Sequence, residues 1–142
     1  MQNEIFSPIF HWRSTKFSDV FDNPDSSFNT YTNPSYTGMS PHQPSTTDAS
    51  IENSHFINCE SSSNGGAVYA YGSSTTSGIQ RLFVEETTFT TCKTTNTLGG
   101  GIYFCNTDNG QCVIFHTCSF NCSSKCTDST DGQYAYIYTK VV

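Results

Sequence analysis

Three titratable side chains recur at one position of a repeated segment in the sequence. Glu52, Glu85 and His116 each lie four residues before a phenylalanine. If the segments stack, these side chains form one column, and two carboxylates at that spacing push their pKa values apart. Such a column could bind a divalent cation or act as acid and base, so these residues form the candidate binding site. Repetition alone also produces columns of outward polar residues, and a solvated column is the simpler interpretation.

Cysteine is the second residue type that could do chemistry. The chain has seven cysteines, and an odd number cannot pair completely within one molecule. Disulfides between stacked segments, reduced thiols packed as small apolar residues, and a zinc site are the alternatives. The clustered cysteines that suggest zinc are Cys105, Cys112, Cys118, Cys122 and Cys126. Their uneven spacing lacks the two paired knuckles of a structural zinc site, so we predict no metal and no cofactor.

The elements that position these residues are repeats, which begin near Ala49. Segments 51–59, 84–92 and 115–122 align, and each is followed by a glycine-led segment at 65–71, 99–104 and 132–138. The steps from Phe56 to Phe89 and from Phe89 to Phe120 are 33 and 31 residues. No window carries the amphipathic pattern of a helix, whereas β-branched residues, Gly and Asn are frequent. The period therefore predicts an all-β coil of stacked parallel strands, a parallel β-helix of about three rungs.

Stacking of equivalent positions predicts the interior of this coil. One aromatic column should contain Phe56, Phe89 and Phe120, because strands in a sheet lie about 4.8 Å apart. A second column should contain Ile51, Val84 and Phe115, and Cys59 and Cys92 should occupy equivalent structural positions. Glycines are expected where the chain turns into a strand and a Cβ would meet the next rung; they are Gly65, Gly66, Gly99 and Gly100. On the outer face, Glu60 and Lys93 should form an exposed ion pair contributing about a few tenths of a kcal/mol.

Residues 1–48 differ in kind from the repeat region, residues 49–142. They hold all five prolines, so we predict an irregular leader, linker or cap. Their many aromatic residues indicate that some are buried and cover an open end of the coil. Alternatively, the span from Phe28 to Gly38 is a decayed extra rung, because it repeats the ten-residue offset from Phe56 to Gly66.

Charge and hydropathy exclude several function classes. The net charge is −6 with only six Lys and Arg, so no basic stripe is available for nucleic acid. No apolar run approaches the ~20 residues of a transmembrane helix, and the first residues lack the pattern of a signal peptide. These features therefore do not predict the cellular compartment of the protein.

The repeats resemble those of a known group of surface proteins. Phe-x-x-Cys, which ends at Cys59 and at Cys92, alternates with Gly-Gly-Ala-Val-Tyr and Gly-Gly-Gly-Ile-Tyr. This is similar to the repeats of polymorphic outer-membrane-protein-like proteins, whose signature couples Gly-Gly-Ala-Ile with Phe-x-x-Asn; here Cys replaces the Asn. Related right-handed β-helix repeats occur in cysteine-containing surface proteins of protists. The resemblance covers about residues 49–142 and implies a right-handed parallel β-helix with a cell-surface or adhesive role.

Two functions follow as hypotheses. The first is a non-enzymatic structural or binding module that contacts a protein or glycan and could self-associate through open coil ends. The second is a truncated or degenerate carbohydrate-active enzyme, because many polysaccharide lyases and hydrolases use this scaffold. Such enzymes combine acids with Arg or Lys along a groove of many rungs, whereas three rungs give a short groove. We therefore predict no catalytic residue.

Overall fold

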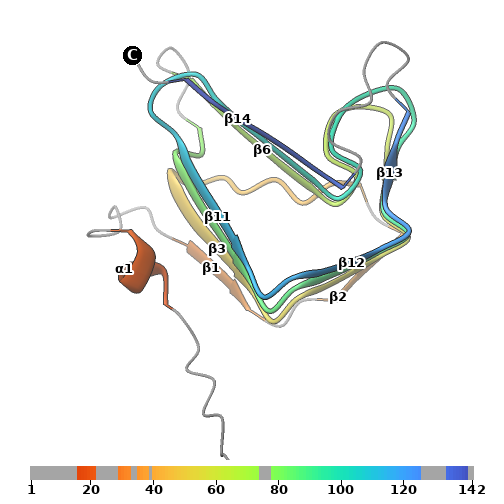
Figure 1. Cartoon of the computed structure of the whole chain (residues 1–142), viewed down its shortest axis with the longest axis horizontal. Coiled ribbons are helices and arrows are strands. Elements are labelled where there is room, and N and C mark those ends of the chain that lie inside the picture. The colour runs from red at the N-terminus through yellow and green to blue at the C-terminus, as the bar shows by residue number, and fades with distance from the viewer. Residues whose placement is uncertain are drawn as a thin grey trace, which may run out of the picture.

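The computed structural model describes residues 16–21, 29–32, 35–38, 40–73, 78–125 and 134–140, and this part of the chain is all-β with parallel sheets (Figure 1). Its one short helix is α1 (Phe17–Val20). Sheet A contains β1 (Asn29–Thr32), β3 (Asp48–Glu52), β7 (Arg81–Glu85) and β11 (Gln111–Phe115). Sheet B contains β2 (Ser35–Thr37), β4 (His55–Ile57), β8 (Thr88–Thr90) and β12 (Cys118–Phe120). Sheet D contains β5 (Glu60–Ser61), β9 (Lys93–Thr94) and β13 (Ser123–Ser124), and sheet C contains β6 (Val68–Gly72), β10 (Ile102–Asn106) and β14 (Ala135–Thr139).

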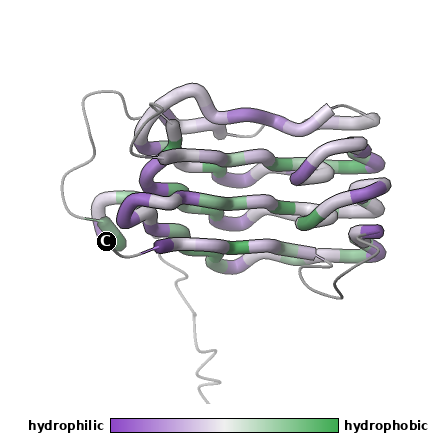
Figure 2. Tube along the Cα trace, turned by 90° about the horizontal axis from the view of Figure 1, so that it is seen from above, coloured by the Kyte–Doolittle hydropathy of each residue, from purple (hydrophilic) through white to green (hydrophobic). Residues whose placement is uncertain are grey.

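The chain runs through sheets A, B, D and C in that order and then begins again. We call one such circuit a pass. The second pass is β3 to β6, the third is β7 to β10, and the fourth is β11 to β14. The passes lie in layers, one on another, in Figure 2. Every pairing between layers is parallel and in register, so equivalent residues of successive passes lie side by side.

A partial first pass precedes these three. β1 pairs with β3, and β2 pairs with β4, although both strands fall within the residues expected to form a leader. Part of the segment 1–48 therefore joins the sheets, as the extra-rung alternative supposed. The offset assumed for that rung is wrong, because Tyr36 and not Phe28 occupies the position equivalent to Phe56. Phe28 itself lies outside the described residues.

The aromatic column is confirmed for two of its three expected members. Phe56 and Phe89 pair across β4 and β8, and their rings stack with centroids 5.1 Å apart and planes 3° apart. Phe120 is wrong as the third member, because it pairs with Thr90 and is 71% exposed. Ser119 lies next to Phe89 instead.

Other aromatic rings extend this column at both ends. Tyr36 stacks on Phe56 with centroids 4.7 Å apart. On the opposite side, where Ser119 is too small to fill the interior, the Tyr134 ring packs edge-on against Phe89 at 5.4 Å. The Tyr134 hydroxyl donates to Thr117 Oγ1, and burial raises the pKa of Tyr134 to about 12.

The aliphatic column is likewise confirmed for two of its three predicted members. Ile51 and Val84 pair as expected and both are fully buried. The third position belongs to Ile114, whereas Phe115 pairs with Glu85 and is 38% exposed. The sequence alignment matched Phe with Phe, but β12 follows β8 by 30 residues rather than 31, as the pairing of Thr88 with Cys118 shows. β11 and β12 were therefore displaced by one residue in this alignment, which moves inward side chains outward, whereas β14 pairs with β10 at the predicted offset.

The corners between sheets repeat their backbone conformation. The residues at the corner after sheet A and at the corner after sheet B adopt positive φ angles between 45° and 54°. They are Asn53, Glu86 and His116 after sheet A, and Asn58, Thr91 and Asn121 after sheet B. After five of these six residues, the next side chain bonds a carbonyl two residues back, as Ser54 Oγ does with Glu52 O at 2.8 Å. These local bonds fix the corner at the same place in each pass.

The expected role is confirmed for three of the four glycines, Gly65, Gly66 and Gly99. Gly65 and Gly99 have φ angles of +72° and +70°, which favour glycine. A Cβ on Gly66 would lie 2.0 Å from the carbonyl oxygen of Gly100 in the next pass. These residues therefore let the chain turn into β6 and β10 while neighbouring passes stay in contact.

The aromatic column should dominate stability. We expect Phe89→Ala to lower the free energy of unfolding by about 3–5 kcal/mol, because it removes a buried ring packed on both faces. Phe120→Ala is the matched control and should change the unfolding free energy by less than about 0.5 kcal/mol. Urea unfolding followed by circular dichroism measures both values. A large loss at Phe120 and a small one at Phe89 would contradict the observed register.

The first pass should also be sensitive to pH. His42 lies against the rings of Tyr31 and Tyr36, and its Nε2 has no hydrogen-bond partner among the described residues. Burial lowers the pKa of His42, so the folded state disfavours its charged form. Stability from the neutral form is fully present above about pH 6.5 and is lost as pH falls toward the lowered folded-state value. We expect His42→Phe to reduce this loss between about pH 6.5 and 5 in thermal unfolding. His55→Gln, at an exposed position, should retain it.

Candidate binding surfaces and the thiol column

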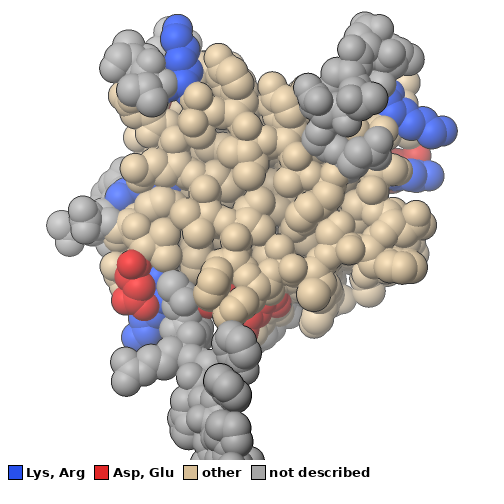
Figure 3. Space-filling view, in the orientation of Figure 1, with Lys and Arg blue, Asp and Glu red and all other residues tan. Residues whose placement is uncertain are grey.

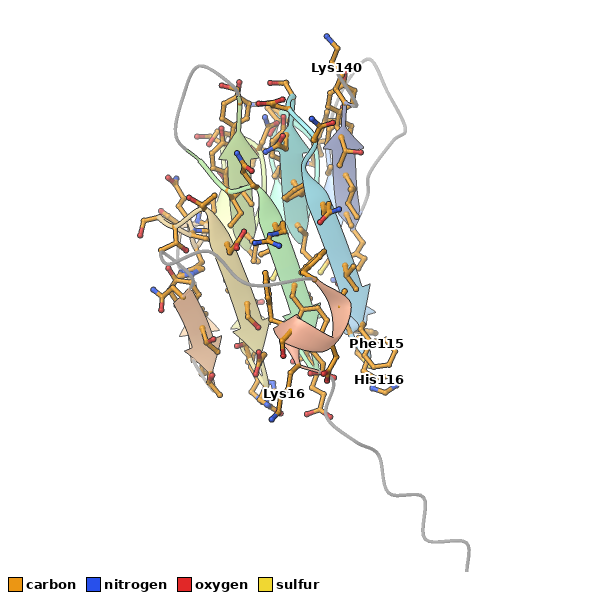
Figure 4. All side chains as sticks on the ribbon, turned by 90° about the vertical axis from the view of Figure 1, so that its left-hand side faces the viewer. Lys16, Phe115, His116 and Lys140 are labelled. Carbon is orange, nitrogen blue, oxygen red and sulfur yellow. The ribbon has the colours of Figure 1, made fainter. Side chains whose placement is uncertain are left out.

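The predicted carboxylate column exists, but its third member differs. Glu52 and Glu85 pair across β3 and β7, whereas Phe115 occupies the equivalent place in β11. His116 is therefore wrong as a member of this column and lies one residue further, at the corner. Its ring stacks on Phe115 with centroids 3.8 Å apart, and Figure 4 shows both at one end of β11. Whether Glu52, Glu85 or His116 binds a ligand stays a prediction.

The two glutamates differ in accessibility. Glu52 is partly buried and accepts a hydrogen bond from Ser50 Oγ. Glu85 is 1% exposed, although its strand position points it away from the coil interior. A substrate approaching from solvent cannot reach a carboxylate buried to this extent. The pair is therefore poorly placed for acid–base catalysis.

Helix α1 helps to bury the outer face of sheet A (Figure 4). Phe17 and Phe21 pack on Phe83, an outward residue of β7 that is 0% exposed. The guanidinium of Arg81 lies 5.7 Å and 5.9 Å from the centroids of the Phe17 and Phe21 rings, and its Nε donates to Asp48 Oδ1 at 2.8 Å. The prediction that some aromatic residues of segment 1–48 are buried is thus confirmed for Phe17 and Phe21. Sheet A uses its outer face for packing rather than for a free binding surface.

Sheet D carries the one expected ion pair. Lys93 Nζ lies 3.1 Å from a carboxylate oxygen of Glu60 across neighbouring strands, which confirms the predicted pair. Both side chains are about half exposed, at 47% and 49%. Solvent screening keeps their contribution small.

The cysteines form the column that the repeat motif predicted and extend it by one member. Cys59 and Cys92 are buried, and each thiol donates to a carbonyl of the preceding pass, Tyr36 O at 3.7 Å and Phe56 O at 3.5 Å. Cys122 does the same with Phe89 O at 3.4 Å. We call Cys59, Cys92 and Cys122 the thiol column. Aligning Cys122 with Cys92, rather than Phe120 with Phe89, would have found the correct register from sequence.

The thiols of this column influence one another. Contact with Cys92 lowers the pKa of Cys122 to about 6 and raises the pKa of Cys92, because the shared proton stays on the buried sulfur. The six cysteines in the described ranges are in the reduced state. Within those ranges no group of three or more His, Cys, Asp or Glu side chains is placed to hold a metal ion. Cys126, the last of the proposed zinc cluster, lies outside them.

Sheet C presents a row of tyrosines on its outer face. Tyr69, Tyr103 and Tyr136 pair in register, with ring centroids 5.5 Å and 5.2 Å apart and planes within 9° of parallel. A second outward row pairs Tyr71, Cys105 and Tyr138. We call these six residues the tyrosine face. Its three strands carry no charged side chain in their described residues.

The tyrosine face is tightly packed at Tyr103 and accessible to solvent at Tyr71 and Tyr138. Tyr103, covered on both ring faces, is 8% exposed, whereas Tyr71 and Tyr138 are 42% and 43% exposed. Burial raises the pKa of Tyr69 and Tyr103, so their hydroxyls stay protonated at neutral pH. None of these tyrosines was predicted from the sequence to belong to the site. The signal was present, since Tyr-x-Tyr at 69–71 and 136–138 has the period of two that marks one face of a strand.

No helix in the described part of the chain is long and apolar enough to cross a membrane. This agrees with the expectation from the hydropathy of the sequence.

Thiol alkylation should report the thiol column. At pH 7 we expect iodoacetamide to modify Cys122 before Cys112, because the pKa of Cys122 is lowered to about 6 while burial raises that of Cys112 to about 12. Peptide mass spectrometry over time measures both rates. Cys92→Ala removes the neighbouring thiol and should slow alkylation of Cys122 by about tenfold at pH 7. Equal rates at Cys122 and Cys112 would contradict the arrangement.

Comparison with known proteins adds no family to these observations. No protein-family model matches the chain, and neither a curated protein nor a solved structure matches it. The likeness of its motifs to surface-protein repeats therefore stays a prediction from the residues that carry it.

Proposed function

We propose that the chain is a right-handed parallel β-helix module with a binding rather than a catalytic role, and that it serves in a cell-surface or adhesion protein. Successive parallel passes with matched interior columns support the β-helix. The cell-surface role rests on the resemblance of the Phe-x-x-Cys and Gly-Gly motifs. The observation that carries the binding role is the tyrosine face, an uncharged aromatic surface on a rigid sheet.

The partner that fits this face best is a protein. Sugar rings bind aromatic residues through an exposed ring face, but the stacked rings of Tyr69, Tyr103 and Tyr136 cover one another and direct their edges outward. Tyrosine is enriched at protein interfaces, where a firm ring contributes contact area and a hydroxyl contributes a hydrogen bond. These features favour a protein over a glycan.

The middle strand of the face carries a smaller residue between two exposed tyrosines. Tyr71 and Tyr138 belong to strands on either side of β10, so they lie about 9.6 Å apart, two strand spacings. Cys105 lies between them and is smaller than tyrosine. An apolar side chain of the partner would contact both rings and cover Cys105. Burial of Glu85 supports the same proposal, because it weakens the alternative of a carbohydrate-active enzyme.

Selection from a random peptide library displayed on phage tests this function. We expect the immobilised chain to enrich peptides whose binding falls about 10- to 30-fold with Tyr71→Ala or Tyr138→Ala, typical of aromatic interface residues. Thr88→Ala and Thr90→Ala, on the outer face of sheet B, are the matched controls and should leave binding unchanged.

Two results would overturn the proposal. The first is enrichment of peptides that bind both tyrosine variants as well as they bind the wild type. The second is binding on a glycan array that is lost with the tyrosine variants while no peptide is enriched, which would make the partner a glycan.

A further inference from the structure

The thiol column is the one place among the described residues where a cysteine lies beside the equivalent cysteine of the next pass. Lys93 N donates to Cys59 O at 2.9 Å, and Ser123 N donates to Cys92 O at 3.0 Å, so the column continues the register of the strands around it. The Cys92 thiol is in hydrogen-bond contact with the thiols of both Cys59 and Cys122. Three sulfur atoms therefore form one row across three passes.

The remaining described cysteines have no such neighbour in their strand pairing. Cys105, Cys112 and Cys118 each lie in a strand of sheet C, A or B. The residues paired with them are tyrosine, leucine and threonine respectively. The strand register therefore brings cysteines together only in the thiol column, within the part of the chain that the structure describes.

The spacing of the column fits a disulfide bond. Equivalent residues of neighbouring parallel strands lie about 4.8 Å apart, and the Cα atoms of a disulfide lie about 4.4–6.8 Å apart. Cys59 and Cys122 are separated by two such spacings, about 9.6 Å, which is beyond this range. Cys92 must therefore take part in any disulfide that forms within the column.

We propose that the thiol column is an oxidation site that holds one disulfide at a time, between Cys92 and either Cys59 or Cys122. The third cysteine of the column keeps its thiol, because Cys92 is already bonded. The bond joins two neighbouring passes at a corner where the strand register already places the two residues side by side. The proposal does not rest on the tyrosine face, since the column lies between sheets B and D.

A small-molecule disulfide, such as oxidised glutathione, supplies the oxidation. A thiolate of the column attacks one sulfur of oxidised glutathione, the S–S bond of glutathione breaks, and one reduced glutathione leaves and takes up a proton. The neighbouring column thiolate then attacks the protein sulfur of this mixed disulfide, and the second glutathione leaves and is protonated in turn. The column pair loses two electrons, and oxidised glutathione gains them.

The surroundings of the column favour the thiolate that both steps need. Lys93 directly follows Cys92, and Lys125 lies three residues after Cys122. Figure 3 shows basic side chains at the margin of the molecule where sheet D lies in Figure 1. Positive charge near a thiol favours its ionised form, and it attracts glutathione, which carries a net negative charge at neutral pH. The lowered pKa of Cys122 acts in the same sense.

Peptide mapping of the full chain tests the site. The reduced chain is unfolded in urea and folded in a buffer of reduced and oxidised glutathione, and the monomeric fraction is alkylated and digested with trypsin without reduction. Cleavage after Arg81, Lys93 and Lys125 separates the column cysteines into peptides 17–81, 82–93 and 94–125. We expect peptide 82–93, whose one cysteine is Cys92, to be linked to one of the other two, with fragmentation placing the bond at a column cysteine.

Variants assign the bond. Cys92→Ser should abolish both linkages, whereas Cys59→Ser and Cys122→Ser should each leave the other linkage. Cys118→Ser, at an exposed cysteine outside the column, is the matched control and should leave the linkage unchanged. The linked wild-type chain should unfold about 10 °C above the reduced chain, because the bond closes a loop of 33 or 30 residues in the unfolded state.

Two results with the wild-type chain would overturn the proposal, whether or not the variants fold. The first is recovery of Cys92 only as a free thiol or as a mixed disulfide with glutathione. The second is a bond between Cys59 and Cys122, or a bond between Cys92 and a cysteine outside the column.

Discussion

Parallel pairing in register is the constraint on which the rest of this structure depends. Neighbouring strands lie about 4.8 Å apart, so each side chain must fit directly against the equivalent residue of the pass before it. Only side chains that stack well with their own kind satisfy this condition through several layers. Phenylalanine, cysteine and tyrosine do so here, in the interior, at one corner and on the outer face of sheet C respectively. The aromatic column, the thiol column and the tyrosine face are thus three results of one geometric rule.

Much of this geometry could be predicted from the sequence, because the spacing of equivalent residues in successive repeats indicates which residues pair between strands. The period, the parallel strands, the pairing of Phe56 with Phe89 and the Glu60–Lys93 ion pair were all predicted from residue spacing. Strands β11 and β12 were misaligned because two signals disagree there by one residue. Phe120 resembles Phe89 in size, whereas Cys122 matches Cys92 in its bond to a carbonyl of the preceding pass. The backbone follows the corner hydrogen bonds, and a ring from elsewhere, Tyr134, fills the space beside Ser119.

Other features were not predictable because they depend on contacts between segments with no shared pattern. The first pass is 20 residues from the second when Tyr36 is matched with Phe56, a step unlike those that follow. Helix α1 covers the outer face of β7 through two phenylalanines, Phe17 and Phe21. Their spacing in the sequence does not indicate which residues they pack against. Glu85 is buried as well, at a position that alternation assigns to solvent. The candidate site thus changed from a carboxylate column to a tyrosine face once the burial of each outer face was known.

Stacking also explains why the chemistry of this chain is graded along the coil. A side chain in the middle of a column has a neighbour on both sides, whereas one in the fourth pass has a neighbour on one side only. The thiols follow this rule, because Cys92 lies between two sulfurs and holds its proton, while Cys122 is the last member and has the lowered pKa. The apolar columns follow it too, since Phe104 is buried and Ile137 is half exposed. The lowered thiol pKa and the exposed interior side chain are therefore both found in the fourth pass, the outermost layer of the described residues.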